Sequence, residues 1–532
     1  MSQPSFNFKP PQFDRAYDYL YHYAQTQGEK IALVYGDERI SYEDLKHRVD
    51  TLATALLERG LQSGERIACL SAPHPECIQL MLASMAIGAI WVGINPRYQL
   101  AEMQHVIDDA RPKFLFSRSQ MGKRDYREEL TALKENHPDL QLVILNGDLK
   151  AANGQSFTDF CEHKNRTNQY LPLDSIDGES PCLIVYTSGT TGKPKGALLK
   201  QSACVRHGKL SLAQFKPEPL KVINYYPVNH VAGIVANSIY TLVGGGCNVL
   251  MEQFNPAKAL ETIEKESITQ WGGIPTMLQL CVAHEDFSKR DLSSVQLLSW
   301  GGSAAPQTLL QTLSERVPYL STLYAATETT GGTFIMPPNR DLDLLAQSVG
   351  QAMNDVEYRL VDEQDNVVSD GNVGELQLKG PFCMLEYWGQ EEATRDTYSK
   401  DGWLKTGDLA KQDNNGNLFL IGRSKEMYKS GGFNVYPREV EQAIEDIDGV
   451  DMIAVVSVPD ELYGEVGHAY ITSKANSQLS EESLREDCRQ RLANYKIPKA
   501  FHLLNHLPLL ANGKIDKKQL QANARAIAEH SS

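Results

Sequence analysis

The sequence predicts an α/β protein with a large N-terminal domain of parallel βα sheets plus a β-rich subdomain, and a small C-terminal α+β domain. Three observations lead to this prediction. Helix and strand patterns alternate over the first hundred residues, short strands separated by Gly and Asp turns occupy residues 374–423, and a separate alternation begins after Arg423. Hydrophobic residues make up 42% of the 532 positions and charged residues 22%, as is usual for a folded globular chain.

The N-terminal alternation begins with a predicted helix over residues 41–60. Apolar residues recur there at helical spacing, Ser41 can cap the start, and Gly60 can adopt the left-handed conformation that ends a helix. A strand, a second helix, a second strand and a turn are expected to follow, at residues 65–70, 76–86, 89–94 and 95–98. This order predicts βαβ units around a parallel sheet.

Further along the chain the pattern weakens and then changes. Residues 118–178 are more polar, and we expect them to wrap the surface as an insertion or connection. An amphipathic helix over 437–447 and an apolar strand up to residue 458 begin the second alternation, which runs to the C-terminus. About a hundred residues can fold as a small domain. We therefore expect domains at 1–424 and 425–532.

Composition excludes several classes of protein. The formal charge of −15 disfavours nucleic acid and anionic membranes as partners, and no basic patch offsets it. The nine cysteines show neither C-x-x-C pairs nor zinc spacing, so buried, reduced thiols are expected. The N-terminus lacks a secretory pattern, and the longest apolar run, Leu80–Ile94, is short for a membrane span. These features predict a cytoplasmic protein without an integral membrane segment, with Leu80–Ile94 forming a buried helix that runs into a strand.

One short stretch is rich in groups that bind phosphate. An apolar strand over residues 182–186 leads into "TSGTTGKPKG", residues 187–196. Glycines let backbone N–H groups turn toward an anion, hydroxyls add donors, and lysines add charge. The stretch is not a Walker loop, because Pro194 follows Lys193 where that motif needs Ser or Thr. Taken alone, such a stretch favours a flexible surface turn over a phosphate loop.

Other motifs accompany this stretch in a recognisable order. They are "YYPVNHVAG" (225–233), "YAATE" (324–328), "GELQLKGP" (374–381), "GWLKTGDL" (402–409), "GRSKEMYKSGGFNVYP" (422–437), "NYKIPK" (494–499) and "LPLLANGK" (507–514). Together with the loop they resemble the adenylate-forming superfamily of acyl-CoA synthetases, peptide adenylation domains and luciferases. The resemblance covers nearly the whole chain. One departure is Ala325, where the family usually has glycine.

The resemblance implies a two-step reaction that uses ATP, Mg²⁺ and coenzyme A. A carboxylate attacks the α-phosphate of ATP, pyrophosphate leaves, and a thiol then attacks the acyl-adenylate. The phosphates would be held by Thr187, Ser188, Gly189, Thr190, Thr191, Gly192 and Lys193. Glu328 would help to hold the metal, and Thr327 would contact the α-phosphate. The rest of the nucleotide would be bound by Gly302, Tyr324, Ala325, Asp408 and Arg423, with Asp408 accepting the ribose hydroxyls.

The resemblance also implies which residues serve each half-reaction. Lys514 would bridge the carboxylate and the α-phosphate, and His230 would line the acyl site. A rotation of the small, mobile C-terminal domain about Lys425 would then bring Gly431 and Gly432 beside the pantetheine arm. Outside this pattern, each residue fits a plainer role as a solvated lysine, a turn glycine or a buried histidine.

The acid itself is less closely defined by the sequence. Its pocket is expected between residues 229–238, 271–275, 299–305 and 325–333, which are mostly apolar and neutral, with Trp271 either capping the pocket or packing in the core. A hydrophobic carboxylate, fatty or aryl, therefore fits best. Alternatives are an enzyme that loads a carrier-protein thiol, a luciferase-like enzyme and a non-catalytic binding protein. A homodimer remains open.

Overall fold

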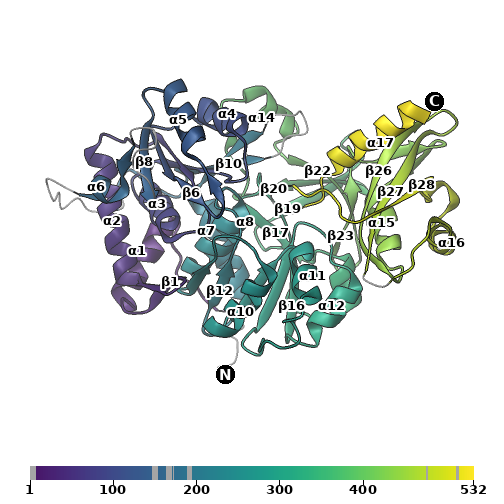
Figure 1. The fold of residues 1–532 in the computed structure, drawn as a ribbon, viewed down its shortest axis with the longest axis horizontal. Coiled ribbons are helices and arrows are strands. Elements are labelled where there is room, and N and C mark those ends of the chain that lie inside the picture. Colours follow the sequence, from purple (N-terminus) through teal and green to yellow (C-terminus); the bar gives the residue numbers. More distant parts are fainter. Residues whose placement is uncertain are drawn as a thin grey trace.

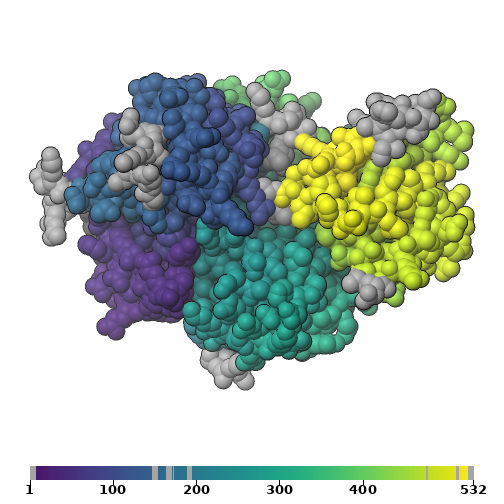
Figure 2. All heavy atoms as spheres, in the orientation of Figure 1, coloured from purple at the N-terminus to yellow at the C-terminus, as the bar shows by residue number. Residues whose placement is uncertain are grey.

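The computed structural model describes residues 8–146, 154–162, 171, 173–187, 194–474, 477–510 and 514–531. Two large sheets form the N-terminal part, a four-stranded antiparallel sheet follows, and a five-stranded sheet with its helices forms a C-terminal unit (Figure 1). Figure 2 shows the C-terminal unit as a separate lobe that touches the middle part of the chain. The expected α/β class and the division into large and small parts are confirmed.

The strands are grouped by sheet. The eight-stranded sheet has the order β21-β11-β10-β4-β3-β5-β8-β9, and the nine-stranded sheet has the order β18-β17-β16-β15-β14-β12-β13-β1-β2. The first contains β3 (Arg66–Leu70), β4 (Ile90–Ile94), β5 (Phe114–Arg118), β8 (Gln141–Asn146), β9 (Gln155–Ser156), β10 (Pro181–Thr187), β11 (Lys195–Lys200) and β21 (Glu386–Tyr387). The second contains β1 (Ile31–Tyr35), β2 (Glu38–Ser41), β12 (Lys221–Asn224), β13 (Cys247–Leu250), β14 (Gln270–Gly273), β15 (Leu297–Gly301), β16 (Tyr319–Ala326), β17 (Gly331–Ile335) and β18 (Gln351–Ala352).

The two smaller sheets follow along the chain. The four-stranded sheet contains β19 (Glu357–Val361), β20 (Gly374–Lys379), β22 (Leu404–Gln412) and β23 (Leu418–Arg423). The C-terminal sheet contains β24 (Tyr428–Ser430), β25 (Phe433–Val435), β26 (Val450–Asp460), β27 (Gly464–Ser473) and β28 (Ala500–Leu504). A short pair, β6 (Gln120–Met121) and β7 (Arg124–Asp125), stands apart.

The helices connect and cover these sheets. In the N-terminal part they are α1 (Ala16–Thr26), α2 (Tyr42–Glu58), α3 (Pro75–Ala86), α4 (Leu100–Ala110), α5 (Arg127–Asn136), α6 (Phe157–Cys161), α7 (Gln201–Gln214), α8 (Val231–Gly233), the π-helical η2 (Ile234–Ile239), α9 (Tyr240–Val243), α10 (Pro256–Glu266), α11 (Pro275–Ala283), α12 (Gln307–Ser314), α13 (Leu342–Gln347) and α14 (Glu391–Thr397). The C-terminal unit has α15 (Pro437–Glu445), α16 (Glu481–Arg491), the 3₁₀ turn η3 (Asn494–Lys496) and α17 (Lys517–Ser531).

The first predicted helix begins and ends close to the residues expected to cap it. It is α2, and the Ser41 hydroxyl accepts a hydrogen bond from the Asp44 N–H at 3.0 Å, which caps the helix start. Gly60, just beyond its end, has a φ of +75°, a conformation that glycine adopts without steric cost. The run Leu80–Ile94 forms the end of α3 and all of β4, both buried, as predicted.

The main core lies between the two large sheets. Buried residues of both sheets and of α1, α2, α3, α7 and η2 form one continuous cluster, in which Trp91 and Phe334 are among the largest side chains. A second cluster packs α10, α11, α12 and α13 on the outer face of the nine-stranded sheet, and a third packs α4 and α5 on the outer face of the eight-stranded sheet. Helices thus cover both faces of each large sheet, as parallel sheets require.

Part of the segment 118–178 differs from the prediction. It does not simply wrap the surface, because β8 is a strand of the eight-stranded sheet and pairs in parallel with β5. Leu142, Val143 and Ile144 are buried in this strand. A four-residue apolar run is long enough for a buried strand but too short to show a period, so the polar surroundings masked it.

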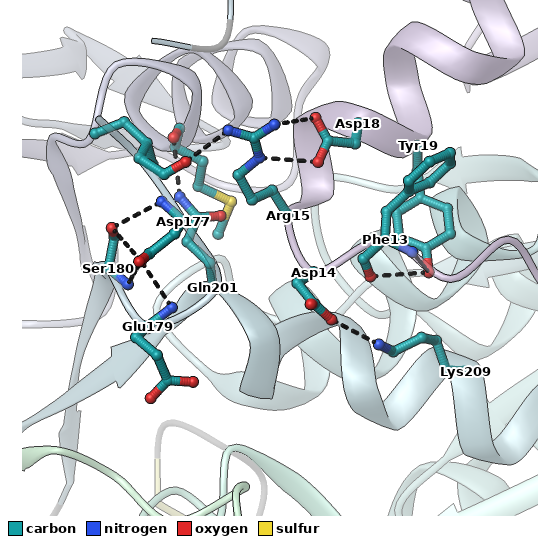
Figure 3. Close-up of polar contacts among 12 residues, drawn as sticks. Phe13, Asp14, Arg15, Asp18, Tyr19, Asp177, Glu179, Ser180, Gln201 and Lys209 are labelled. Carbon is teal, nitrogen blue, oxygen red and sulfur yellow. Dashed lines mark hydrogen bonds and ion pairs between the residues drawn. The ribbon is translucent and has the colours of Figure 1, made fainter. Parts of the chain in front are cut away.

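The chain before α1 is fixed to the body of the protein by polar contacts, which Figure 3 shows. Arg15 pairs with Asp18 at 2.8 Å and donates to the carbonyl of Ile176 at 2.6 Å (Figure 3). Lys209 of α7 pairs with Asp14 at 3.0 Å. These contacts join the first helix to α7, which lies beneath the nine-stranded sheet's β17.

Two expectations about composition can be compared with the structure. All nine cysteines are free thiols, and seven of them are buried, as predicted. Across the described ranges, no helix is both long enough and apolar enough to cross a membrane.

Candidate active site

The predicted phosphate loop connects two antiparallel strands. Thr187 ends β10 and lies opposite Lys195, the first residue of β11, and its hydroxyl is 3.4 Å from the Lys195 carbonyl. The predicted loop residues Ser188, Gly189, Thr190, Thr191, Gly192 and Lys193 lie outside the described residues. Lys195 places its ammonium 5.2 Å from the centre of the Tyr387 ring, a cation–π contact.

That tyrosine leads to the predicted metal ligand. The Tyr387 hydroxyl donates to Glu328 Oε1 at 2.7 Å, and the backbone N–H of Met384 donates to the Glu328 carbonyl at 2.8 Å. Burial, followed by the charge of Glu328, raises the pKa of Tyr387, so its hydroxyl stays a donor. Thr327 begins a turn that Thr330 closes with a backbone hydrogen bond at 3.0 Å. The carboxylate of Glu328 is thereby oriented, with its second oxygen outside this hydrogen bond.

The predicted nucleotide residues of β16, β22 and β23 meet directly. Asp408 is buried, accepts a hydrogen bond from the Tyr324 hydroxyl at 2.5 Å and pairs with Arg423 Nε at 2.9 Å. The charge of Asp408 is the main reason that the pKa of Arg423 is raised. Arg423 keeps 56% of its side-chain surface exposed, so the pair faces open space rather than the core.

Lys514 reaches this group from the C-terminal unit. A Cβ placed on Gly302 would lie 3.3 Å from Lys514 Cε and 3.8 Å from Nζ. Lys514 is exposed, yet the surrounding protein atoms and the charge of Arg423 lower its pKa. The predicted residues Lys514, Gly302, Asp408 and Arg423 therefore lie in one place, although more than two hundred positions separate Gly302 from Lys514.

His230 lies beside the same lysine. Burial, with a smaller effect of the Lys514 charge, lowers the pKa of His230 to about 4. Its Nδ1 accepts the N–H of Ala232 at 3.1 Å and caps α8. The imidazole is thus neutral at physiological pH, with Nδ1 as an acceptor, and it lies where α8 and η2 approach the site.

Some residues that support the site lie outside the recognised motifs, behind Ala325. Ala325 is exposed on β16 opposite Gly332 of β17. Behind it, His207 Nδ1 accepts the N–H of Gly332 at 3.3 Å, and Arg206 donates to the Gly332 carbonyl at 2.7 Å. Arg206 is also paired with Asp355. Sequence reasoning missed these residues, as it missed Tyr387, because neither the adjacent Arg206 and His207 of α7 nor a single tyrosine stands out in the sequence.

The predicted thiol-step residues lie apart from this group. Gly431 and Gly432 form a two-residue turn between β24 and β25, with φ values of +58° and +86° that suit a type I′ hairpin. The Gly431 N–H donates to the Tyr463 carbonyl at 2.8 Å, within the C-terminal unit. Lys425 is exposed in the turn that joins β23 to β24.

Comparisons with known proteins place this geometry in a family. Residues 20–388 match the family "AMP-binding enzyme" and residues 439–514 match "AMP-binding enzyme C-terminal domain". The chain belongs to the AMP-binding enzymes. Its relatives in that family include the feruloyl-CoA synthase of an Amycolatopsis species, 31% identical over 94% of this chain and 96% of the relative. The human mitochondrial medium-chain acyl-CoA ligase is 32% identical over 94% of this chain and 85% of the relative.

A solved AMP-binding enzyme has the same fold along the whole chain. The crystal structure of the anthranilate CoA ligase AuaEII in complex with anthranoyl-AMP superposes with a TM-score of 0.87 and 25% identity, covering 98% of this chain and 99% of that one. The adenylate-forming family expected from the motifs is thus confirmed. So is the reaction class, AMP-forming ligation of an acid to a thiol.

Proposed function

We propose that the chain is an ATP-dependent acid–CoA ligase that converts a carboxylic acid, ATP and CoA into acyl-CoA, AMP and pyrophosphate. The observation that carries this proposal is the position of Lys514 beside Gly302, in the electrostatic reach of Asp408 and Arg423. A lysine delivered there by the C-terminal unit supplies the positive charge that a carboxylate needs to approach a triphosphate.

In the first half-reaction, the acid attacks the α-phosphate while the protein neutralises and orients both anions. Lys514 is a flexible point charge suited to bridging carboxylate and phosphate. Asp408 receives the ribose hydroxyls, because each of its oxygens has a lone pair left after bonding to Tyr324 and Arg423. His230, being neutral, lines the acyl side without adding charge. Thr187 to Lys193 hold the departing pyrophosphate, and Thr327 contacts the α-phosphate.

Mg²⁺ fits this site as a companion of the nucleotide. Hard cations take oxygen ligands, and Glu328 offers a carboxylate that Tyr387 orients by one oxygen only. In the part of the chain that the structure describes, no group of three or more His, Cys, Asp or Glu residues forms a metal site. We therefore expect phosphate oxygens to provide most of the ligands, with Glu328 as the protein ligand; the metal supplies neutralisation of the phosphate charge.

The second half-reaction requires another arrangement of the C-terminal unit. Lys514 would withdraw, and the Gly431–Gly432 turn would approach the site so that the pantetheine thiol reaches the acyl-adenylate. We propose domains at 1–424 and 425–532, with Lys425 as the hinge, because it is exposed in the turn between β23 and β24. A hinge needs only a few residues to absorb the change in dihedral angles.

The test is AMP release with ATP, Mg²⁺ and CoA across fatty, aryl and short-chain acids. We expect CoA-dependent AMP formation with one class of acid. Lys514→Ala should slow acyl-adenylate formation at least 100-fold, and Lys518→Ala, which changes a nearby lysine of α17, should retain native activity. The proposal fails if no acid gives AMP. Adenylate formation without transfer to CoA would instead indicate a carrier-protein thiol as the acceptor.

A further inference from the structure

Three polar atoms border a small space above Gly272 of β14. A Cβ placed on Gly272 would meet nothing nearer than Tyr226 Oη at 3.8 Å, Asn237 Oδ1 at 3.9 Å and Ser299 Oγ at 4.0 Å. The three residues come from different elements: Tyr226 follows β12, Asn237 lies in η2, and Ser299 lies in β15. We call Tyr226, Asn237 and Ser299 the polar trio.

Among the described residues, none of these three atoms has a hydrogen-bond partner, although Tyr226 and Asn237 are more than nine-tenths buried. Their remaining polar groups are satisfied. Asn237 Nδ2 donates to the Ala232 carbonyl at 2.7 Å, which also fixes which amide atom faces the space. Ser299 is half-buried and all three atoms are accessible within the space, so a ligand that enters it can pair with them.

Three neighbouring hydroxyls, unlike those of the polar trio, have hydrogen-bond partners. Tyr225 donates to the Gly272 carbonyl, Tyr240 donates to Gln270 Oε1 at 2.6 Å, and Ser321 donates to the Met336 carbonyl at 2.6 Å. These three hydroxyls are therefore satisfied within the protein. The three groups that point into the space above Gly272 remain open.

The polar trio lies at a suitable distance from the reacting atoms. Ser299 precedes Gly302 by three positions at the end of β15, so strand geometry separates them by roughly 10 Å. Gly302 is where Lys514 enters the site. Gly272 is paired with Ser299 in the parallel sheet, so both positions face the same side of the sheet, toward η2. An acyl group that extends from Lys514 along β15 would therefore reach this space.

We propose that the polar trio binds a neutral hydroxyl group roughly 10 Å from the carboxyl group of the acid, so that hydroxylated acids are the preferred substrates. This inference rests on the proposed function and narrows its substrate class. The Asn237 oxygen can only accept, so the ligand must donate an O–H or N–H. The two protein hydroxyls can then donate to the ligand oxygen. The trio contains no charged group, so an ammonium or a second carboxylate is not matched.

The protonation state of the trio supports this assignment. Burial raises the pKa of Tyr226, so its hydroxyl stays protonated across the physiological range and can donate. The walls expected from the sequence were apolar and neutral, and they remain neutral. Under this proposal their inner end is polar, and an unsubstituted fatty acid would leave the trio unpaired.

The test compares matched acids that differ only by the distal hydroxyl: cinnamate with 4-hydroxycinnamate, and octanoate with 8-hydroxyoctanoate. For the full chain with ATP, Mg²⁺ and CoA, we expect kcat/KM to favour the hydroxylated acid of at least one pair about tenfold or more. Tyr226→Phe and Ser299→Ala should each reduce that ratio about three- to tenfold. Tyr358→Phe, whose hydroxyl bonds to Gln412 in the four-stranded sheet, should keep the native ratio.

A binding measurement separates this inference from the proposed function. In the presence of ATP, the hydroxylated acid should raise the Tm more than its partner does, and Tyr226→Phe should remove the difference. Equal kcat/KM and equal Tm shifts within both pairs would overturn the inference, as would a preference that Tyr226→Phe and Ser299→Ala leave unchanged. Absence of AMP formation with every acid would count against the ligase function, while the Tm difference would still decide the role of the trio.

Discussion

Replacing Gly302 by alanine tests whether the observed approach of Lys514 is the arrangement used for adenylate formation. The added Cβ would lie 3.3 Å from Lys514 Cε, closer than ordinary van der Waals contact, so the lysine would have to shift by a few tenths of an ångström. Gly302 also has a φ of +87°, which costs an L-residue roughly 1–2 kcal/mol. The variant therefore carries two separate penalties, one in backbone stability and one at the reacting centre.

The kinetic penalty follows from positioning. A displacement of about 1 Å at a reacting centre can cost about 100-fold in rate, so a smaller shift of Lys514 predicts a loss of about 10- to 100-fold. Acid-dependent ATP–pyrophosphate exchange measures the first half-reaction. Single-turnover conversion of isolated acyl-adenylate with CoA measures the second, for which Lys514 is not needed. We expect the exchange rate to fall by this factor and the thiol step to change far less.

Gly371→Ala provides a matched control for the backbone penalty. Gly371 has a φ of +83°, and a Cβ there would meet no atom within 4 Å. It should lose similar stability while retaining the native exchange rate. Equal losses of exchange in both variants, or equal losses in both half-reactions of Gly302→Ala, would refute the assignment of Lys514 to adenylate formation.

Two further predictions concern residues behind the site. Tyr387→Phe removes the hydrogen bond to Glu328, so the Mg²⁺ concentration for half-maximal activity should rise about three- to tenfold; an unchanged Mg²⁺ titration would argue against Glu328 as the ligand. Burial holds the pKa of His207 at about 4 instead of 6.5. The neutral form is favoured in the folded state, so stability is full above pH 6.5 and falls toward pH 4, by about 3 kcal/mol from this group. The free energy of unfolding, measured in urea at several pH values, should fall less in His207→Asn. In His47→Asn, on the exposed face of α2, it should fall with pH as much as in the native protein.

Periodic patterns identified most of the N-terminal elements because those elements bury one face. The helix after Ser41 and the buried run Leu80–Ile94 have enough residues to show a helical period or a continuous apolar stretch. The strand Gln141–Asn146 was missed because its apolar part is short. The pairing of β21 with β11, almost two hundred positions away, could not be predicted, since local patterns do not determine which distant strands share a sheet.

The site shows the same division between local and long-range information. Motifs marked Asp408, Arg423 and Lys514 through resemblance, and their meeting is a property of the folded chain. Tyr387 was not marked, because a single tyrosine gives no signal until its hydroxyl is seen on Glu328. The polar trio was also missed, since residue types alone do not reveal that Tyr226 is left unpaired while Tyr225 beside it is satisfied.

Under the proposed roles of Lys514 and the Gly431–Gly432 turn, the observed arrangement serves adenylate formation and not the thiol step. Lys514 and the Gly431–Gly432 turn belong to the same C-terminal unit, and the lysine lies at Gly302 while the turn contacts Tyr463 away from it. Gln279 of α11 also donates to the Asp451 carbonyl across the boundary at 3.3 Å. Lys514 and the turn cannot exchange places unless contacts such as this one break. A single hydrogen bond contributes only about 1 kcal/mol, so this contact alone does not lock the arrangement. This agrees with our proposal that Lys514 occupies this position for adenylate formation and leaves it when the thiol must enter.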